Sequence, residues 1–104
     1  MTHAALPTRY HPRVEAGFMV KLHMNGRSML AKADDLSMAG LRLLGEFSPK
    51  VDALKVSIPL PGDREITTEA TIKRHDLDAM AIEFKQLDWD DMFALARFLH
   101  PRLP

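Results

Sequence analysis

The fold follows first from residues 18–36, which read FMVKLHMNGRSMLAKADDL. Their first half places the apolar side chains Phe18, Val20, Leu22 and Met24 at every second position, as in a strand with one buried face. Asn25-Gly26 then indicates a two-residue hairpin turn, because both central positions of such a turn need a positive φ. The stretch therefore predicts two antiparallel strands, over residues 18–24 and from residue 27 to about residue 36.

Four further segments favour strands. They are residues 40–44, 54–58, 65–75 and 79–84, and glycine, proline or aspartate residues stand in the turns around them. Residues 65–75 are rich in β-branched side chains, and alternate positions from Ile66 to Ile72 are expected to point inward. The sequence thus contains six predicted strands.

The last element has a helical period. Trp89, Met92, Phe93, Ala96 and Leu99 recur at helical spacing, and we expect them to form the apolar stripe of a helix. The helix is expected to begin at the N-cap Asp88 and to end before Pro101. We therefore predict an all-β fold, a six-stranded antiparallel β-barrel with a C-terminal α-helix packed on it.

The composition limits the class of protein. The 104 residues suit one domain, and the lack of Cys excludes disulfides, thiolate nucleophiles and Cys-based zinc sites. No apolar run approaches the roughly 20 residues that cross a bilayer. A formal net charge of zero argues against a nonspecific binder of nucleic acid or of membrane surfaces. We therefore expect a cytoplasmic protein that binds no nucleic-acid polymer and does not insert into membranes.

The charge is unevenly distributed along the chain. Residues 1–33 hold five Lys or Arg and one acid, so a compact anion would find positive charge there. Pro7 and Pro12 disfavour a helix near the N-terminus. We expect residues 1–16 to form a flexible arm and residues 17–104 to form the barrel with its helix.

Signatures of an enzyme are absent from the sequence. The five histidines lack the spacing of metal ligands, and Ser37 lacks the glycine-flanked elbow of a serine hydrolase. There is also no glycine-rich loop that would cradle a phosphate. We expect no catalytic residue, no bound metal and no cofactor.

Two short motifs remain. Arg9 and Arg13 form an R-x-x-x-R pair in the predicted arm, and Asp35, Ser37 and Gly40 form D-x-S-x-x-G between the second and third strands. Taken singly, the first motif is explained by two solvated arginines. The second is explained by a turn in which Asp and Ser bind backbone N–H groups and Gly has a positive φ.

Taken together, the two motifs resemble those of the PilZ domain. Arg13 and Asp35 are 22 positions apart, and the strand order and the C-terminal helix also fit that family from about residue 8 to the last helix. The resemblance implies a barrel that binds the bacterial second messenger cyclic di-GMP (c-di-GMP). By motif position, Arg9 and Arg13 would contact guanine and phosphate, Asp35 and Ser37 would contact a guanine, and Gly40 would allow close approach.

The chemistry of these side chains suits that ligand. A guanidinium group can fork onto guanine O6 and N7 or pair with a phosphate. A carboxylate accepts hydrogen bonds from guanine N1–H and N2–H, which arginine cannot do. Two arginines and one carboxylate would therefore match a ligand with two phosphates and two guanines.

Three hypotheses about function remain open at this point. The first is a single-domain c-di-GMP receptor whose arm closes over the ligand and alters the surface that a downstream protein partner recognises. The second is a PilZ-like module for protein–protein interaction that does not bind the nucleotide. The third is a small barrel that binds single-stranded nucleic acid, which neutral charge and few aromatic residues on the predicted strands disfavour.

Overall fold

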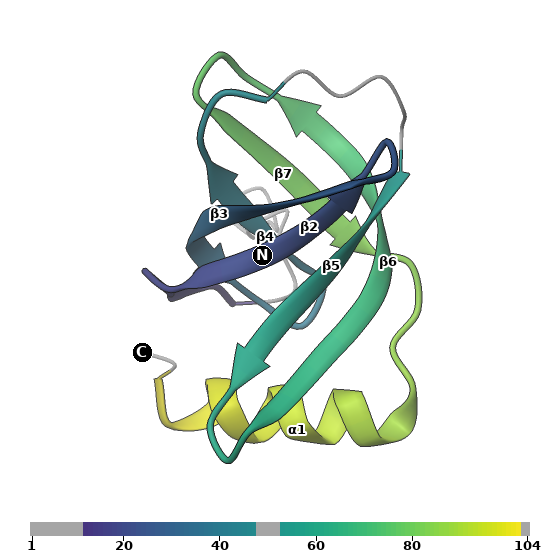
Figure 1. Cartoon of the computed structure of the whole chain (residues 1–104). Helices are drawn as coiled ribbons and strands as arrows, with labels where there is room; N and C mark the ends of the chain where they lie inside the picture. The colour runs from purple at the N-terminus through teal and green to yellow at the C-terminus, as the bar shows by residue number, and fades with distance from the viewer. Residues whose placement is uncertain (1–11, 48–52, 103–104) are drawn as a thin grey trace, which may run out of the picture.

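Seven strands form one antiparallel sheet that closes on itself (Figure 1). The computed structural model describes residues 12–47 and 53–102. The strand order is β1-β3-β2-β5-β6-β7-β4, and a further pairing between β3 and β4 closes six of the strands into the predicted barrel. The elements are β1 (Val14–Glu15), β2 (Met19–Met24), β3 (Arg27–Leu36), β4 (Gly40–Leu44), β5 (Ala53–Leu60), β6 (Arg64–His75), β7 (Ala79–Phe84), α1 (Trp89–Leu99) and the 3-10 helix η1 (His100–Arg102).

The first hairpin confirms the prediction from residues 18–36. Asn25 has φ 55° and Gly26 has φ 74°, and Met24 pairs with Arg27 across the turn. Val20 and Leu22 of β2 are buried, as the alternation predicted. Phe18 precedes β2 and is half-buried, so the strand begins one residue later than expected.

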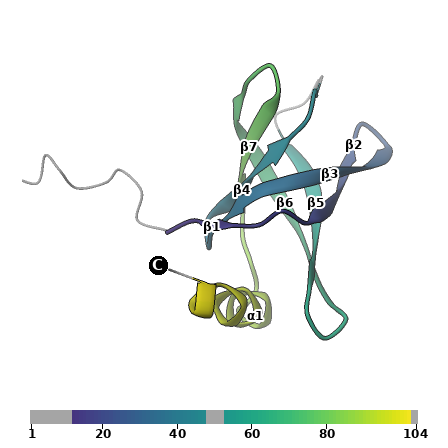
Figure 2. The ribbon, with the colours of Figure 1, turned by 90° about the vertical axis from the view of Figure 1, so that its left-hand side faces the viewer.

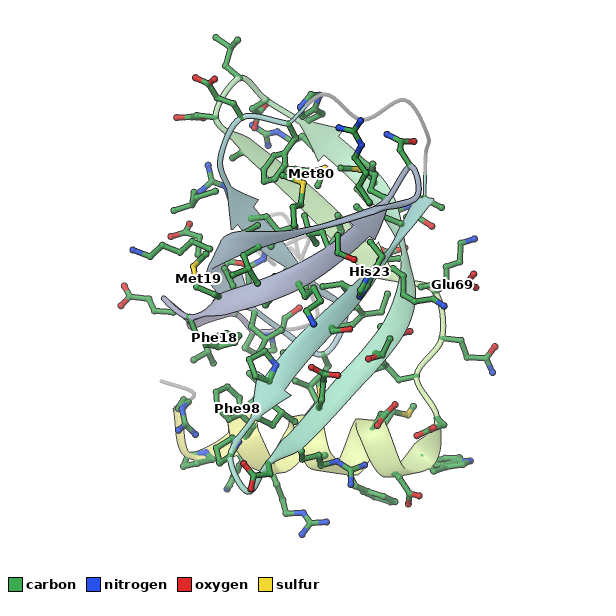
Figure 3. The ribbon with its side chains drawn as sticks, in the orientation of Figure 1. Phe18, Met19, His23, Glu69, Met80 and Phe98 are labelled. Atoms are coloured by element: carbon green, nitrogen blue, oxygen red, sulfur yellow. The ribbon has the colours of Figure 1, made fainter. Side chains whose placement is uncertain are left out.

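The core fills the interior of the barrel with side chains from every long strand. The largest fully buried side chains include Met80, which points inward from β7 (Figure 3). Each such side chain contributes roughly 1.5–3 kcal/mol relative to an exposed one. The others are Leu22, Leu36, Leu43, Ile58, Ile66, Leu95, Val20 and Val56.

The seventh strand, β1, differs from the sequence expectation. Val14 pairs with Leu36 and Glu15 with Asp35, on the edge of β3 that also carries β2 (Figure 2). Val14 is buried in the core, so residues 14 and 15 are not part of a free arm. Two residues are too few for a periodic signal, which explains why the sequence did not indicate this strand.

Helix α1 lies across one end of the barrel beside the β5–β6 hairpin (Figures 1 and 2). As predicted, the Asp88 carboxylate caps it, accepting a hydrogen bond from the Asp91 N–H at 2.8 Å. Phe98 meets Phe18 edge to face, with ring centroids 6.0 Å apart (Figure 3). Asp91 also pairs with Arg64 of β6 at 3.3 Å. These contacts fix the rotation of the helix about its axis.

That rotation corrects the predicted apolar stripe. Leu95 and Leu99 are buried, whereas Trp89 is 73% exposed, Phe93 is 57% exposed and Ala96 is also exposed. The helix carries two apolar stripes, and the open end of a small barrel can cover only one of them. Of the five residues in the predicted stripe, Trp89, Phe93 and Ala96 are therefore exposed to solvent, and only part of the stripe packs on the barrel. Within the described residues, no helix is both long and apolar enough to cross a membrane.

Candidate functional site

The structure brings parts of the two sequence motifs into contact. The Arg13 guanidinium Nη1 lies 3.2 Å from Asp35 Oδ1 and 3.3 Å from Asp35 Oδ2. The contact forms because β1 pairs with β3, which places Arg13, directly before β1, beside Asp35. The side chains are 36% and 21% exposed, so both remain accessible to a ligand.

Ser37 holds the turn between β3 and β4. It is buried, and its hydroxyl accepts hydrogen bonds from the backbone N–H groups of Ala39 (3.1 Å) and Gly40 (3.3 Å). The same hydroxyl is placed to donate to the Gly40 carbonyl at 3.3 Å. Ser37 therefore fixes the loop that follows Asp35, as the turn interpretation of the motif predicted.

Glycine is required at position 40 for a different reason from the one that the turn interpretation gives. It begins β4, and its φ is not in the left-handed region, so the expected positive φ is wrong. A Cβ at this position would meet the carbonyl oxygen of Ile82 and the Cα of Glu83 on β7. Glycine is thus required here because the backbones of β4 and β7 approach closely.

The remaining motif residue, Arg9, lies outside the described residues, so its predicted contact with the ligand stays a prediction.

The Arg13–Asp35 pair lies in a cleft of about 610 Å³ on the outer face of the barrel. This volume is in the range of small-molecule sites. The lining side chains carry four cations and three carboxylates, together with one small apolar residue. They are Arg13, Asp34, Asp35, Arg42, Lys73, Arg74, Asp76 and Ala81.

Most of the cations in the cleft lie beside a carboxylate. Arg42 Nη1 is 2.7 Å from Asp34 Oδ2, and Arg74 Nε is 3.1 Å from Asp76 Oδ2. These side chains are more than a third exposed, so each pair contributes little to stability, about 0–1 kcal/mol. The cleft therefore presents guanidinium donors and carboxylate acceptors that can exchange partners at small cost.

Sequence reasoning did not single out Arg42, Lys73 or Arg74. The available signal was two doublets of charged residues, Asp34-Asp35 and Lys73-Arg74, inside predicted strands. In a regular strand with one buried face, one member of each doublet would point into the core. Such a doublet therefore indicates a local irregularity in the strand. Among the residues that the structure describes, no group of three or more His, Asp or Glu is arranged to hold a metal ion.

The sequence matches a family model, and the structure matches solved structures. The sequence model of the PilZ domain matches residues 7–100. No curated protein matches the sequence.

Similar solved structures share the barrel. The inhibitor of motility MotI/DgrA of Bacillus subtilis has a TM-score of 0.79 at 21% identity, covering 93% of this chain and 52% of its own. The PilZ domain of YcgR from Escherichia coli, solved with c-di-GMP, has a TM-score of 0.75 at 10% identity, covering 92% of each chain. The K. pneumonia MrkH–c-di-GMP complex has a TM-score of 0.72 at 20% identity, covering 92% of this chain and 52% of its own.

This chain therefore spans about half the length of MotI/DgrA and of MrkH. At these identities, the similar structures establish the fold. The family match covers almost the entire chain, from two residues before Arg9 to one residue after the end of α1. The chain belongs to the PilZ domain family.

Proposed function

We propose that this protein is a receptor for c-di-GMP and that the ligand binds in the cleft that contains Arg13 and Asp35. The observation that carries the proposal is the contact between these two motif residues at 3.2 Å in a cleft of about 610 Å³. Further support comes from YcgR and MrkH, which have the same fold and were solved with c-di-GMP.

Binding would exchange the partners of the Arg13–Asp35 pair. The Arg13 guanidinium would turn to a phosphate or to guanine O6 and N7, and the Asp35 carboxylate would accept from guanine N1–H and N2–H. An exposed ion pair is weak, about 0–1 kcal/mol, whereas hydrogen bonds to charged groups contribute about 1.5–3 kcal/mol. The exchange is therefore favourable for a ligand that satisfies both side chains.

The remaining motif residues complete the proposed site. Arg9 would add a second guanidinium from the N-terminal segment. Ser37 would contact a guanine from the turn in which its hydroxyl already binds the backbone of Gly40. Gly40 would serve by keeping β4 close to β7, beside the cleft.

The proposed signal is closure of the segment that carries Arg9. Contacts from Arg9 and Arg13 to one ligand would draw this segment against the barrel and change the surface around the cleft. A downstream protein partner would then recognise the changed surface. On this proposal the protein works in the cytoplasm as an adaptor and catalyses no reaction.

Calorimetric titration of the purified protein tests the proposal. We expect saturable binding of c-di-GMP, much weaker binding of GTP and no binding of a short single-stranded oligonucleotide. Tight binding of the oligonucleotide would instead support a nucleic-acid binder. No heat with c-di-GMP at concentrations that saturate related receptors would refute the receptor proposal.

A second candidate function is a PilZ module that recognises a protein and binds no nucleotide. The observation that favours it is the pair of exposed aromatic side chains on α1, Trp89 and Phe93, whose centroids are 6.1 Å apart. Exposed aromatic residues are common anchors of protein interfaces. The same titration separates the two candidates, because this module would give no heat with c-di-GMP.

A further inference from the structure

Four residues of the cleft stand in one row across four neighbouring strands. In the register of the sheet, Asp35 of β3 lies opposite Arg42 of β4, and Arg42 lies opposite Ala81 of β7. Ala81 in turn lies opposite Arg74 of β6. Residues that are laterally paired in an antiparallel sheet point to the same face. Because Asp35 lines the cleft, the row extends the motif site from β3 across to β6.

Two irregularities in the sheet bring additional charged side chains to the two ends of this row, in β3 and β6. The register of β3 against β4 shifts between Ala33 and Asp35, and that of β6 against β7 shifts between Ile72 and Arg74. Such a β-bulge lets two consecutive side chains point outward. Both charged doublets, Asp34-Asp35 and Lys73-Arg74, consequently line the cleft.

The two bulges lie at the same level of the barrel, on either side of the β4–β7 pair. Their alignment brings both charged doublets to one cleft. Bulges are concentrated near binding sites, where they re-aim side chains. The second bulge, in β6, therefore points to a binding role for Lys73 and Arg74.

Ala81 gives the row its shape. Its side chain is a single methyl group on β7, the strand between those that carry Arg42 and Arg74. Since neighbouring strands are about 4.8 Å apart, the backbones of β4 and β6 are separated by about 10 Å. That separation leaves room for a purine ring over Ala81, between the two arginines.

We infer that Arg42, Ala81, Lys73 and Arg74 form a second half-site, which binds the guanine and the phosphate of c-di-GMP that Arg13 and Asp35 do not hold. The inference rests on the proposed function. The ligand has two equal halves, and the one motif carboxylate, Asp35, can accept hydrogen bonds from the N1–H and N2–H groups of only one guanine. Arg42 and Arg74 supply guanidinium forks for the other half, and Lys73 supplies a further positive charge. Lys73 Nζ lies 3.4 Å from Glu83 Oε1, and a phosphate could replace Glu83 in this exposed pair.

Calorimetry on single variants of the full chain tests this half-site. We expect Arg74→Ala to weaken binding of c-di-GMP by about 10-fold or more, as for the loss of one charge-assisted contact. Ala81→Leu should reduce binding by a similar factor, because its larger side chain occupies the space for the ring. Lys21→Ala is the matched control, since it removes an exposed cation from β2, outside the cleft, and should leave the affinity unchanged.

The half-ligand GMP provides a second readout. GMP needs only the Arg13–Asp35 half-site, so Arg74→Ala should weaken GMP binding much less than c-di-GMP binding. Circular dichroism and melting temperature should stay at wild-type values, because Arg74 and Ala81 point away from the core.

The outcomes distinguish this inference from the proposed function. In one outcome, wild-type protein binds c-di-GMP, Arg13→Ala does not, and both Arg74→Ala and Ala81→Leu bind it with wild-type affinity. The half-site is then refuted and the receptor proposal stands. If a variant lowers the stoichiometry but leaves the remaining dissociation constant unchanged, these residues hold a separate molecule, which also refutes the half-site. If wild-type protein binds no c-di-GMP, the proposed function fails and the half-site fails with it.

Discussion

At the scale of single residues, the site depends on a contact that stabilises the fold only slightly. The Arg13 and Asp35 side chains are 36% and 21% exposed, so solvent screens their attraction. On the proposed function, the same two groups would become strong partners for c-di-GMP, because a charge-assisted hydrogen bond contributes about 1.5–3 kcal/mol. Binding and stability should therefore respond very differently to changes at Arg13.

Arg13→Ala should weaken c-di-GMP binding by about 10- to 150-fold while it changes the free energy of unfolding by less than about 1 kcal/mol. Calorimetry and urea unfolding measure the two effects. The matched control is Arg64→Ala, which removes a similar exposed pair, Arg64–Asp91 at 3.3 Å, beside α1. Equal losses of affinity in the two variants would show that the effect of Arg13 is general electrostatics.

Gly40→Ala should destabilise the fold. The added Cβ would contact the Ile82 carbonyl oxygen on β7, and backbone atoms cannot move aside as a side-chain end can. We expect a loss near the upper end of the about 1–3 kcal/mol typical of overpacking, with a lower melting temperature in a thermal scan. Gly26→Asn is the control, because the turn has open space there and Asn tolerates a positive φ. A melting temperature for Gly40→Ala equal to that of Gly26→Asn would contradict this account.

The motif residues show how far sequence reasoning reaches at this scale. The resemblance to a family motif selected Arg13 and Asp35, which the structure brings into contact, and the turn interpretation explained Ser37 from its local sequence. The turn interpretation gave Gly40 a positive φ, which the structure contradicts, because the need for glycine comes from the approach of β7, some 40 residues further along the chain.

At the scale of elements, alternation and turn chemistry were sufficient to predict the six main strands and the helix. Their boundaries agree within two residues, and the largest difference is at the C-terminal end of β5, which extends through Pro59 to Leu60. Pro59 is tolerated there because β2 pairs with β5 only from Lys55 to Ser57. Strand β1 was missed because pairing with β3 defines it, and no pattern within the two residues does so.

The buried face of α1 gives a prediction at this scale. Leu95→Ala should lower the free energy of unfolding by about 2–5 kcal/mol, because Leu95 is fully buried against the barrel. Phe93→Ala on the same helix should cost less than about 1 kcal/mol, since Phe93 is 57% exposed. Urea unfolding of both variants measures the difference. A larger loss for Phe93→Ala would mean that α1 is rotated to bury the stripe first expected from the sequence.

At the scale of the whole molecule, the proposed signal is a change confined to one side of the barrel. We expect the amides of residues 9–13 to exchange rapidly with solvent in the free protein and to become protected when c-di-GMP binds. The cost of ordering this segment, roughly 1–2 kcal/mol per residue, is comparable to the gain from the arginine contacts, so closure should be reversible.

Hydrogen-exchange mass spectrometry with and without c-di-GMP measures this change. The strands from β2 onward should change much less, because their hydrogen bonds already form the barrel. Protection of residues 9–13 without ligand, or no protection at saturating ligand, would rule out closure as the signal.

The proposed function requires that c-di-GMP binds in the cleft across β3, β4, β7 and β6. The most direct single measurement is a two-dimensional amide NMR titration of the full chain with this ligand. The proposed function predicts saturable changes in amide chemical shift that cluster at residues 34–42, 73–76 and 81. Little change is expected at the exposed face of α1 around Phe93. Shifts that cluster on α1 and leave the cleft unchanged, or spectra that do not change at all, would contradict it.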